Sequence, residues 1–412
     1  MIYLGFLLHL YQPPQQVSEV MRTICNESYR PLMRLINMRS DARFTMNINW
    51  SLTERWLRDG YSDLVDAVRV ALESDRIEIT SSAAYHAIVP LIPRSERARQ
   101  VLLNDDRSRG VYGKSYHPVG FFPPEMAFGP EVVDTLKPLG YKWTITDDAP
   151  FSALHGSVPG TWIPAVEGFP VVLRSGMWSN RVSMERNERG EMRGGAEMAH
   201  WLIDGMSDWF GEEDGYCVIA MDGETFGHHH KGYIEKFLVP FLDTLSSRSD
   251  EIRLVHVKEI VEKFPHKAAG VPPGSWSTSR EEFLRGDFYP LWKGHRNEAH
   301  DLLWELTTLA HSGVDRLHQM LDQGLNSCTF WWVGRNPGEF NPMTLGGIKM
   351  LMQLIRLGNP EAVEKAEAIH SQLVGILGPP PPLPSGGNGP PGSPPRPRES
   401  PGAKVPARKK GV

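Results

Sequence analysis

The chain has 412 residues and a formal net charge of −5, and charges of both signs are spread along most of it. This length can bury a large core and favours one extended α/β domain with an appendage over three small domains. There is no basic stripe for nucleic acid, and the charge balance does not favour acidic substrates.

The N-terminal apolar run at 3–8 predicts a first core strand and not a signal peptide. It lacks a basic region and a small-residue cleavage site, and the polar residues His9 and Gln12 follow at once. No stretch of the chain approaches the roughly 20 apolar residues that a membrane span needs. We therefore expect no membrane association.

The three cysteines, Cys25, Cys217 and Cys328, are odd in number and far apart, and they do not have metal-ligand spacing. Cys217 lies in an apolar run, which is typical of a small buried hydrophobic residue. This cysteine usage indicates a reducing compartment, and together with the N-terminus it predicts a cytoplasmic protein.

Short apolar runs alternate with helical patterns through the first two-thirds of the chain. The predicted strands are 3–8, 44–48, 76–80, 119–123, 142–146, 216–221 and 252–257. The predicted helices are 17–38, 52–57, 61–74, 94–109, 130–139, 233–245 and 258–264. Alternation of this kind predicts a parallel sheet, and seven strands suggest an α/β fold with an open or incomplete (β/α) barrel.

The alternation breaks in two places. Near 160–183 the runs 168–174 and 177–183 are interpreted as an inserted hairpin. After residue 274 the pattern becomes amphipathic and helical, with helices predicted at 297–324, 343–357 and 361–377.

These breaks divide the chain into three predicted parts. Residues 1–265 form the barrel domain, 266–377 a helical-bundle subdomain, and 378–412 a Pro/Gly-rich tail with a basic end. The tail lacks the apolar residues that would offset the entropy of ordering, so we expect it to be disordered. Its basic end could contact acidic partners, but a solvated tail is the simpler interpretation.

In a parallel barrel, side chains at the C-terminal strand ends converge on one face, where active sites lie. The residues predicted on that face are His9, Gln12, Glu78, Tyr85, His86, Glu125, Asp148, Asp222 and Glu224. The segments 121–126 and 221–227 are the most informative, because each sets a carboxylate at the end of an apolar run beside aromatic residues. Glycosidic-bond chemistry needs one acid to protonate the leaving oxygen and another to attack or to activate water.

With these motifs the chain resembles glycoside hydrolase family 57. HLYQP at 9–13 looks like the family's first conserved segment, a His-x-His-Gln-Pro pattern, and RIEIT at 76–80 with Tyr85 is similar to the second. FPPEM at 122–126 is similar to the third and DGETFG at 222–227 to the fourth. The resemblance covers residues 1 to about 375, and the last two segments are specific in combination.

The resemblance implies an incomplete (β/α)7 barrel with a helical C-terminal subdomain that acts on α-glucans with retention and without a catalytic metal or other cofactor. It implies that Glu125 is the nucleophile and Asp222 the general acid/base. The candidate substrate-binding or supporting residues are His9, Gln12, Glu78, Tyr85, Asp148, Glu224, His229 and Trp276. Retention requires carboxyl groups roughly 5–5.5 Å apart, which neighbouring strand ends can supply. Burial and the negative Glu125 should raise the pKa of Asp222.

Two positions depart from the family pattern. Tyr11 stands where the family usually has its second histidine, and His229 stands where several members carry a tryptophan that stacks on sugar. Both bear on substrate specificity more than on catalysis.

Simpler interpretations exist for several of these residues. Glu125 could be an acid at a helix N-terminus, and Asp222 could begin an Asp-Gly turn. Asp148, together with the aspartate before it, could simply cap a loop.

The sequence offers a histidine run and three tryptophans as further candidates. The three adjacent histidines at 228–230 cannot all point at one ion, so solvated or substrate-facing side chains fit them better than a metal site. On an extended segment Trp331 and Trp332 would face opposite ways, and at most one would reach a cleft. Trp276, at the domain junction, is the better candidate for stacking on sugar.

Three functions are therefore compared. The first is a retaining α-glucan enzyme: an amylase-type hydrolase, or a 4-α-glucanotransferase or branching enzyme that uses the same intermediate. The second is a metal-dependent polysaccharide deacetylase, which needs an aspartate and two histidines at helical spacing that we do not find near the acids. The third is a carbohydrate-binding protein without catalysis. The partner expected is an α-glucan or maltooligosaccharide, and the sequence leaves the oligomeric state open.

Overall fold

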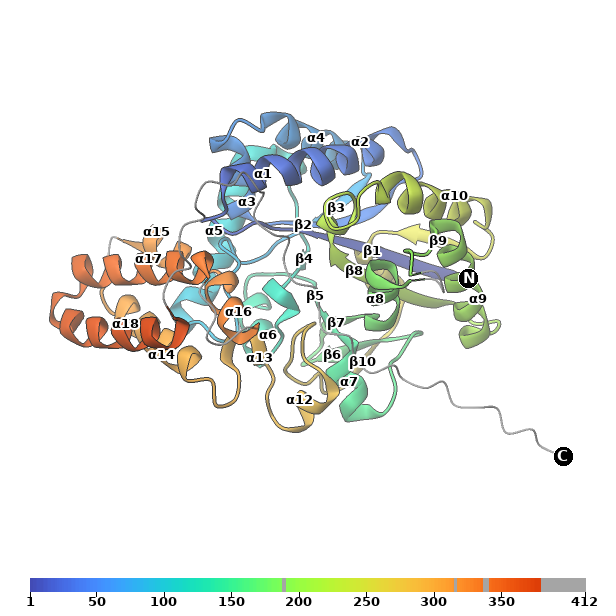
Figure 1. The fold of residues 1–412 in the computed structure, drawn as a ribbon. Helices are drawn as coiled ribbons and strands as arrows, with labels where there is room; N and C mark the ends of the chain where they lie inside the picture. The colour runs from blue at the N-terminus through green and yellow to red at the C-terminus, as the bar shows by residue number, and fades with distance from the viewer. Residues whose placement is uncertain (187–189, 315–316, 336–340, 379–412) are drawn as a thin grey trace. The chain divides into compact units, whose positions relative to one another are not determined.

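The computed structural model describes residues 1–186, 190–314, 317–335 and 341–378 (Figure 1). The predicted disordered tail, 378–412, falls outside these residues except for its first position. Within the described part of the chain, no helix is both long and apolar enough to span a membrane.

Strand β1 (Ile2–Leu10) is the centre of the fold. One of its edges pairs in parallel with β8 (Gly215–Asp222) along almost its whole length. Its other edge pairs in parallel with β9 (Ile252–Val255) at the start and with β2 (Phe44–Ile48) at the end. A strand buried by neighbours on both edges and by side chains on both faces is apolar along its whole length, which is the pattern of the N-terminal run.

Seven parallel strands surround the barrel interior. They are β1, β2, β3 (Ile77–Thr80), β4 (Gly120–Phe121), β5 (Trp143–Asp147), β7 (Phe169–Arg174) and β8. A parallel bridge between Ser81 and Phe121 connects β3 to β4. A backbone hydrogen bond of 2.8 Å from Ser175 to Val218 connects β7 to β8. The predicted parallel α/β barrel is confirmed. It is incomplete between β7 and β8, where the backbone hydrogen bonding is sparse.

The predicted hairpin near 160–183 needs correction. The antiparallel strands are β6 (Ile163–Val166) and β7, and β10 (His266–Ala268) extends this sheet beside β6. β7 also pairs in parallel with β5, so it belongs to the barrel and is not an insertion. The expected strand at 177–183 is wrong, because Ser175 caps a helix there, α8 (Gly176–Met184), by accepting a hydrogen bond from the Trp178 backbone.

Helices cover the outside of the barrel (Figure 1). They are α1 (Ser18–Ile24), α2 (Arg30–Met38), α3 (Trp50–Arg58), α4 (Ser62–Glu73), α5 (Arg94–Tyr112), α6 (Pro130–Leu136), α7 (Asp148–His155), α8, α9 (Gly195–Phe210), α10 (Val239–Ser247) and α11 (Val257–Lys263). A π-helical turn, η1 (Cys25–Tyr29), joins α1 to α2, and a second, η5 (Ile234–Leu238), leads into α10. Short 3₁₀ turns are η2 (Gly113–Ser115), η3 (Pro124–Met126), η4 (Gly223–Thr225) and η6 (Pro360–Ala362).

The last third of the chain is helical, as predicted. Its helices are α12 (Arg280–Leu284), α13 (Pro290–Lys293), α14 (Glu298–His311), α15 (His318–Gly324), α16 (Ser327–Arg335), α17 (Pro342–Gly358) and α18 (Val363–Leu377). Trp331 and Trp332 lie in α16, so the extended segment expected there is wrong. The side chain of Asn326 accepts a hydrogen bond from the Thr329 backbone and so starts the helix.

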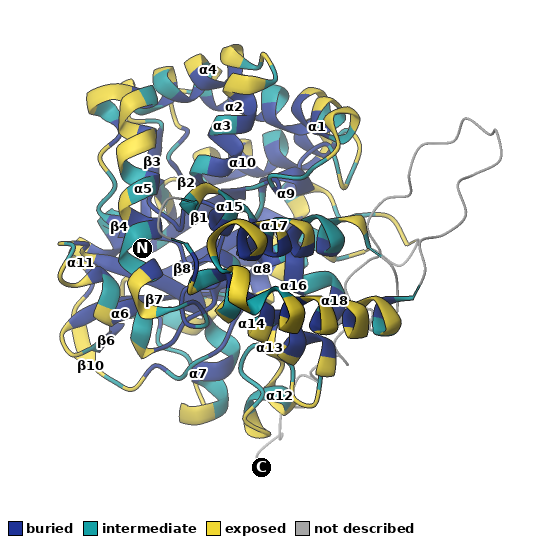
Figure 2. Ribbon diagram, turned by 90° about the vertical axis from the view of Figure 1, so that its left-hand side faces the viewer, coloured by how far each residue is buried: buried dark blue, intermediate teal, exposed yellow. Residues whose placement is uncertain are grey.

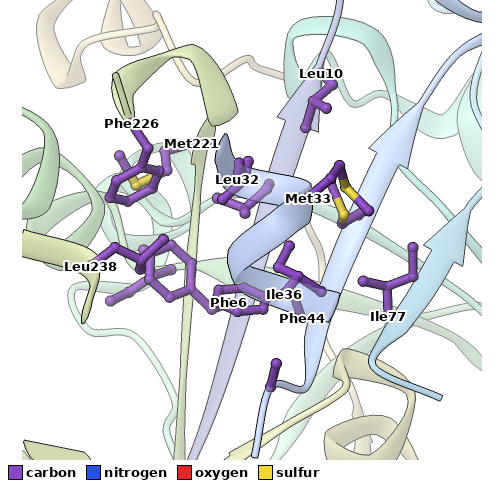
Figure 3. Close-up of a cluster of buried hydrophobic side chains, with 14 of the residues drawn as sticks. Phe6, Leu10, Leu32, Met33, Ile36, Phe44, Ile77, Met221, Phe226 and Leu238 are labelled. Atoms are coloured by element: carbon purple, nitrogen blue, oxygen red, sulfur yellow. The ribbon is translucent and has the colours of Figure 1, made fainter. Parts of the chain in front are cut away.

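Alternation along the strands separates an outer core from the barrel interior. Phe6 and Leu8 of β1 face outward and pack with residues of α2 and α10, as Figure 3 shows for Phe6, Leu32 and Ile36. Leu7 faces inward and packs with interior residues such as Val218. Because the side-chain period of a strand is two residues, each position along a strand is assigned to one of these faces.

The C-terminal helices pack through a third apolar cluster. Leu303 of α14, Leu351 of α17 and Leu373 of α18 belong to it, together with Val132 of α6 on the barrel. Figure 2 shows buried residues on the inner sides of α14, α17 and α18 and exposed residues on their outer sides. The described residues belong to one compact unit, so the domain boundary at 265/266 stays a prediction.

Gly227 offers a test of how the loop after β8 is held. It has a φ of 108°, and a Cβ atom there would collide with the backbone carbonyl of Glu27 in η1. We expect Gly227→Ala to lower the free energy of unfolding by about 2 kcal/mol or more, from backbone strain and lost packing. Gly110→Ala in α5 is the matched control, because its Cβ would meet open space. Chemical denaturation of both variants checks this, and equal effects would contradict it.

Candidate active site

Strand parity places Asp222 at the mouth of the barrel. Tyr216, Val218 and Ala220 of β8 lie in the interior cluster, so Asp222, at the end of the strand, has the same inward direction. His9 of β1 is its register partner and is also inward. The C-terminal strand end therefore presents a carboxyl group and an imidazole side by side.

Glu125 lies in η3, directly after β4, in a left-handed backbone conformation. Its φ is 59° and its ψ is 18°, and Met126 follows with a φ of 50°. For a non-glycine residue this conformation costs on the order of 1 kcal/mol or more, and it persists only where the surroundings hold it. Two contacts do so: the Trp276 backbone donates to the Glu125 carbonyl at 3.2 Å, and Thr146 Oγ1 donates to the Met126 carbonyl at 3.2 Å.

Both carboxyl oxygens of Glu125 accept hydrogen bonds. Trp276 Nε1 donates to Oε2 at 2.9 Å, and Ser327 Oγ donates to Oε1 at 3.0 Å. His86 Nδ1 lies 3.8 Å from Oε1. Protein covers the Glu125 side chain so that 12% of it is exposed. The carboxylate is therefore fixed from two sides by neutral donors.

A chain of buried side chains continues from Ser327 into the barrel. His86 Nδ1 is 2.8 Å from Ser327 Oγ, and His86 Nε2 is 3.0 Å from His9 Nε2. His9 Nδ1 is 2.8 Å from Asn47 Oδ1 on β2. The ring of Tyr11 stacks on His86 with centroids 3.7 Å apart. His86, in the predicted strand-end set, thus contacts the site directly.

The two acids carry raised pKa values. Burial, and then the charge of Asp222, raises the pKa of Glu125 to about 7, against the hydrogen bonds from Ser327 and Trp276. Burial raises the pKa of Asp222, and the nearby His9 and Arg174 oppose that shift. The predicted direction for Asp222 and the contribution of burial are thus present, but Glu125 is not among the causes. Both acids therefore hold a proton more readily than an exposed carboxyl group does.

Arg174 is a site residue that the sequence analysis missed. It ends β7 with its side chain inward, donates through Nε to the Ala220 carbonyl at 2.7 Å, and pairs through Nη1 with Asp147 at 2.5 Å. Its guanidinium lies 5.8 Å from the centre of the Trp276 ring. The sequence does contain a signal for this residue, which is an arginine at the end of an apolar strand. A charge in such a place is buried only where it has partners.

Gln12 and Glu224 form a supporting cluster beside Asp222. Gln12 Nε2 donates to Glu224 Oε1 at 3.1 Å, and the Tyr29 hydroxyl donates to the same oxygen. Burial, and then the charge of Asp222, raises the pKa of Glu224 to about 8. Tyr29 ends the π-turn η1, and π-turns are frequent at functional sites because they reorient single side chains.

The structure places Glu78 and Tyr85 outside the carboxyl cluster. Glu78 faces the interior from lower on β3, level with Thr45, and its Oε2 accepts from Thr45 Oγ1 at 2.9 Å and from the Lys258 backbone at 3.1 Å. Tyr85 is buried, and its hydroxyl donates to Glu54 at 3.0 Å. Neither makes a described hydrogen bond to Glu125 or Asp222, so contact of either with substrate stays a prediction.

Asp148 and His229 lie at the periphery. Asp148 begins α7 and accepts a hydrogen bond from the Gly176 backbone at 3.1 Å, while its neighbour Asp147 caps the helix and faces Arg174. Burial, and then Asp147, raises the pKa of Asp148 to about 7. The His229 side chain is exposed.

The flanking histidines of the 228–230 run have separate partners. His228 Nδ1 is 2.9 Å from Glu27, and His230 Nε2 is 2.8 Å from the Ser183 carbonyl. Within the described residues, no group of three or more His, Cys, Asp or Glu side chains is placed to hold a metal ion.

Comparison with known sequences gives a family match. A family model described as glycosyl hydrolase family 57 matches residues 8–272. An alpha-amylase from Pyrococcus horikoshii is 24% identical over 274 residues, which are 64% of this chain and 40% of the relative. A 4-alpha-glucanotransferase from Thermococcus litoralis is 25% identical over 146 residues, which are 35% of this chain and 22% of the relative. The chain thus spans at most 40% of the length of these two relatives.

Comparison with solved structures supports the fold. The crystal structure of 4-alpha-glucanotransferase from Thermococcus litoralis aligns with a TM-score of 0.70 at 17% identity, covering 86% of this chain and 60% of that one. The branching enzyme of the GH57 type from Pyrococcus horikoshii aligns with a TM-score of 0.65 at 15% identity, covering 90% and 94%. The second alignment includes nearly all of both chains, helical region included.

Glu78 gives a prediction for stability against pH. Burial raises its pKa to about 7 in the folded protein, from about 4.3 in an unfolded chain. Between these two pKa values the folded state holds the Glu78 proton more tightly than the unfolded state does. The free energy of unfolding is therefore highest below pH 4 and declines as the pH rises through 7. We expect Glu78→Gln to gain roughly 3 kcal/mol relative to wild type between pH 4.5 and 8.

Urea denaturation across that pH range measures the difference. Glu73→Gln, at an exposed position on α4, is the matched control and should leave the pH dependence of wild type in place. A Glu78→Gln effect of the same size at every pH would show that burial of the Glu78 charge is not the cause.

Proposed function

The chain belongs to glycosyl hydrolase family 57, and from this membership and the site geometry we propose that it cleaves α-glucans with retention, Glu125 acting as nucleophile and Asp222 as general acid/base. The observation that carries the proposal is the pair of partly buried carboxyl groups at the barrel mouth, each with a raised pKa. Retention needs one carboxylate and one carboxylic acid, and a raised pKa lets a carboxyl group keep the proton that the acid must supply.

In the first step, the Glu125 carboxylate attacks the anomeric carbon while the bond from that carbon to the leaving oxygen breaks. Asp222 gives its proton to that oxygen, and a glycosyl-enzyme ester forms on Glu125. In the second step, Asp222, now a carboxylate, takes a proton from water or from a sugar hydroxyl. The resulting nucleophile attacks the anomeric carbon and releases Glu125 as a carboxylate.

The surroundings of the two acids support the proposed roles. Trp276 and Ser327 donate hydrogen bonds to Glu125 and so favour its anionic form. Burial favours the protonated form of Asp222, as an acid in the first step requires. Arg174 and His9 stabilise the Asp222 carboxylate that the first step produces.

We propose amylase-like hydrolysis of α-1,4 bonds as the reaction, with 4-α-glucan transfer or branching through the same ester as the alternative. The relatives named above include both an alpha-amylase and a 4-alpha-glucanotransferase. The reactions differ only in whether water or a sugar hydroxyl attacks the glycosyl-enzyme ester. The exposed His229 and the indole of Trp276 are the proposed substrate contacts. The three free cysteines support a cytoplasmic location for this chemistry.

Substitution of either acid tests the two roles. Glu125→Gln and Asp222→Asn should each lower kcat on maltooligosaccharides by about 10²-fold or more, because each removes an ionisable group that the reaction needs. Asp66→Asn, in an exposed ion pair with Arg69, is the matched control and should keep wild-type activity. Full activity of Glu125→Gln would refute the assignment of the nucleophile.

The products distinguish the proposed reactions. Proton NMR during the first minutes of amylose cleavage should show newly formed reducing ends in the α configuration, because two inversions restore the original one. Chain-length analysis should give only shorter products for hydrolysis; longer α-1,4 chains would mean transfer, and new α-1,6 linkages would mean branching. Initial release of the β anomer would exclude the double displacement.

A further inference from the structure

Ser327 occupies a place between the proposed nucleophile and a buried histidine pair. Its Oγ is 3.0 Å from Glu125 Oε1 and 2.8 Å from His86 Nδ1. Its backbone N–H also donates to the His86 carbonyl at 3.0 Å, and it is the first residue of α16. Two bonds to His86 therefore fix the position of this hydroxyl next to Glu125.

The hydrogen-bond chain behind His86 determines which nitrogens carry protons. Asn47 Nδ2 donates to Thr80 Oγ1 at 3.1 Å, so Asn47 Oδ1 is the atom that faces His9 Nδ1. His9 Nδ1 must therefore donate, and its Nε2 must accept from His86 Nε2 if both rings are neutral. Burial lowers the pKa of both histidines, which keeps them neutral. His86 Nδ1 is then an acceptor.

A serine hydroxyl carries one proton, and here it has two acceptors. When Glu125 is ionised, the charge-assisted bond to its carboxylate is the stronger one. When Glu125 is protonated or esterified, its charge is gone and the bond to His86 Nδ1 becomes the better choice. Rotation about the Cβ–Oγ bond is enough to exchange the two.

We propose that Ser327 is a positioning residue whose single hydroxyl proton alternates between Glu125 and His86, so that the His9–His86 pair adjusts the strength of the nucleophile. Donation to Glu125 stabilises the carboxylate of the free enzyme. Donation to His86 stabilises the state in which Glu125 is neutral, which includes the glycosyl-enzyme. This inference rests on the proposed role of Glu125.

Other groups face Glu125 and contribute to its titration. Asp222 at the end of β8 raises its pKa, and the phenol of Tyr11 and the thiol of Cys328 also lie within reach of its charge. The Arg174 guanidinium lies behind Trp276. These groups are common to wild type and to variants at Ser327 and His86, so differences between the proteins report on the alternating hydroxyl.

Two substitutions should move the titration in opposite directions. Ser327→Ala removes a donor to the carboxylate, so the acid limb of kcat/KM should move up by about 1 pH unit, which lowers kcat/KM about tenfold on that limb. Ser327→Thr keeps a hydroxyl and should restore the wild-type profile. His86→Gln retains an amide N–H that can donate to His9 but lacks the ring nitrogen Nδ1 that accepts from Ser327, so the acid limb should move to lower pH.

A substrate-free readout separates this inference from the proposed function. Infrared difference spectra between high and low pH, compared with Glu125→Gln, isolate the carbonyl stretch of protonated Glu125. Ser327→Ala should raise the midpoint of that signal and His86→Gln should lower it, even if no glucan is turned over. Absence of turnover with both shifts present would refute only the function.

Thr308→Ala serves as the control, since Thr308 donates to the Trp304 carbonyl on the exposed face of α14. It should leave the infrared midpoint and the pH profile unchanged. A uniform loss of activity in Ser327→Ala at all pH values, with an unshifted infrared midpoint, would overturn the inference and leave Ser327 a structural role. If Ser327→Ala does not fold, a His86→Gln midpoint at or above that of wild type overturns it.

Discussion

The free-energy cost of taking a carboxyl group out of water determines which groups surround the mouth of this barrel. Glu125 and Asp222 are both enclosed, and an ionised carboxylate in such a place is costly unless charges or donors compensate it. The structure provides two neutral donors to Glu125, and it provides the cation of Arg174 near Asp222. These partners lower the cost of a charge on either carboxyl group, while burial favours a proton on both.

The same constraint explains the strained backbone near the site. Among the six described non-glycine residues with positive φ, three are His86, Glu125 and Met126. A left-handed residue turns the chain sharply after a strand and points its side chain back across the barrel mouth. The cost is offset because Ser327 and Trp276 bind the side chains and backbone that result. Strain and hydrogen bonding are thus two aspects of one local arrangement.

Local sequence was sufficient to predict most strands of the barrel and to place Glu125 and Asp222 at strand ends, but not to predict their neighbours. Short apolar runs identify β2 and β8, and Asp222 ends the second of them. An error of one residue at a strand end exchanges the side chains on the two faces of the strand. For this reason the sequence predicts Asp148 as the site residue, although Asp147 is the one that faces Arg174. Ser327 was beyond local reasoning, because 202 residues separate it from Glu125. Only the packing of α16 against the loop after β3 brings the two together.

The helical region therefore contributes to the candidate active site as well as packing against the barrel. Ser327 at the start of α16 contacts Glu125, and Cys328 beside it lies near the phenol of Tyr11. Tyr11 in turn stacks on His86, so the residue that departs from the family pattern touches the relay and not the acid pair itself. A change at Tyr11 would then act on Glu125 through the stacked ring of His86. Trp276 and Ser327, the two donors to Glu125, both come from the chain after residue 265, so the barrel part alone would place both acids but leave Glu125 without either donor.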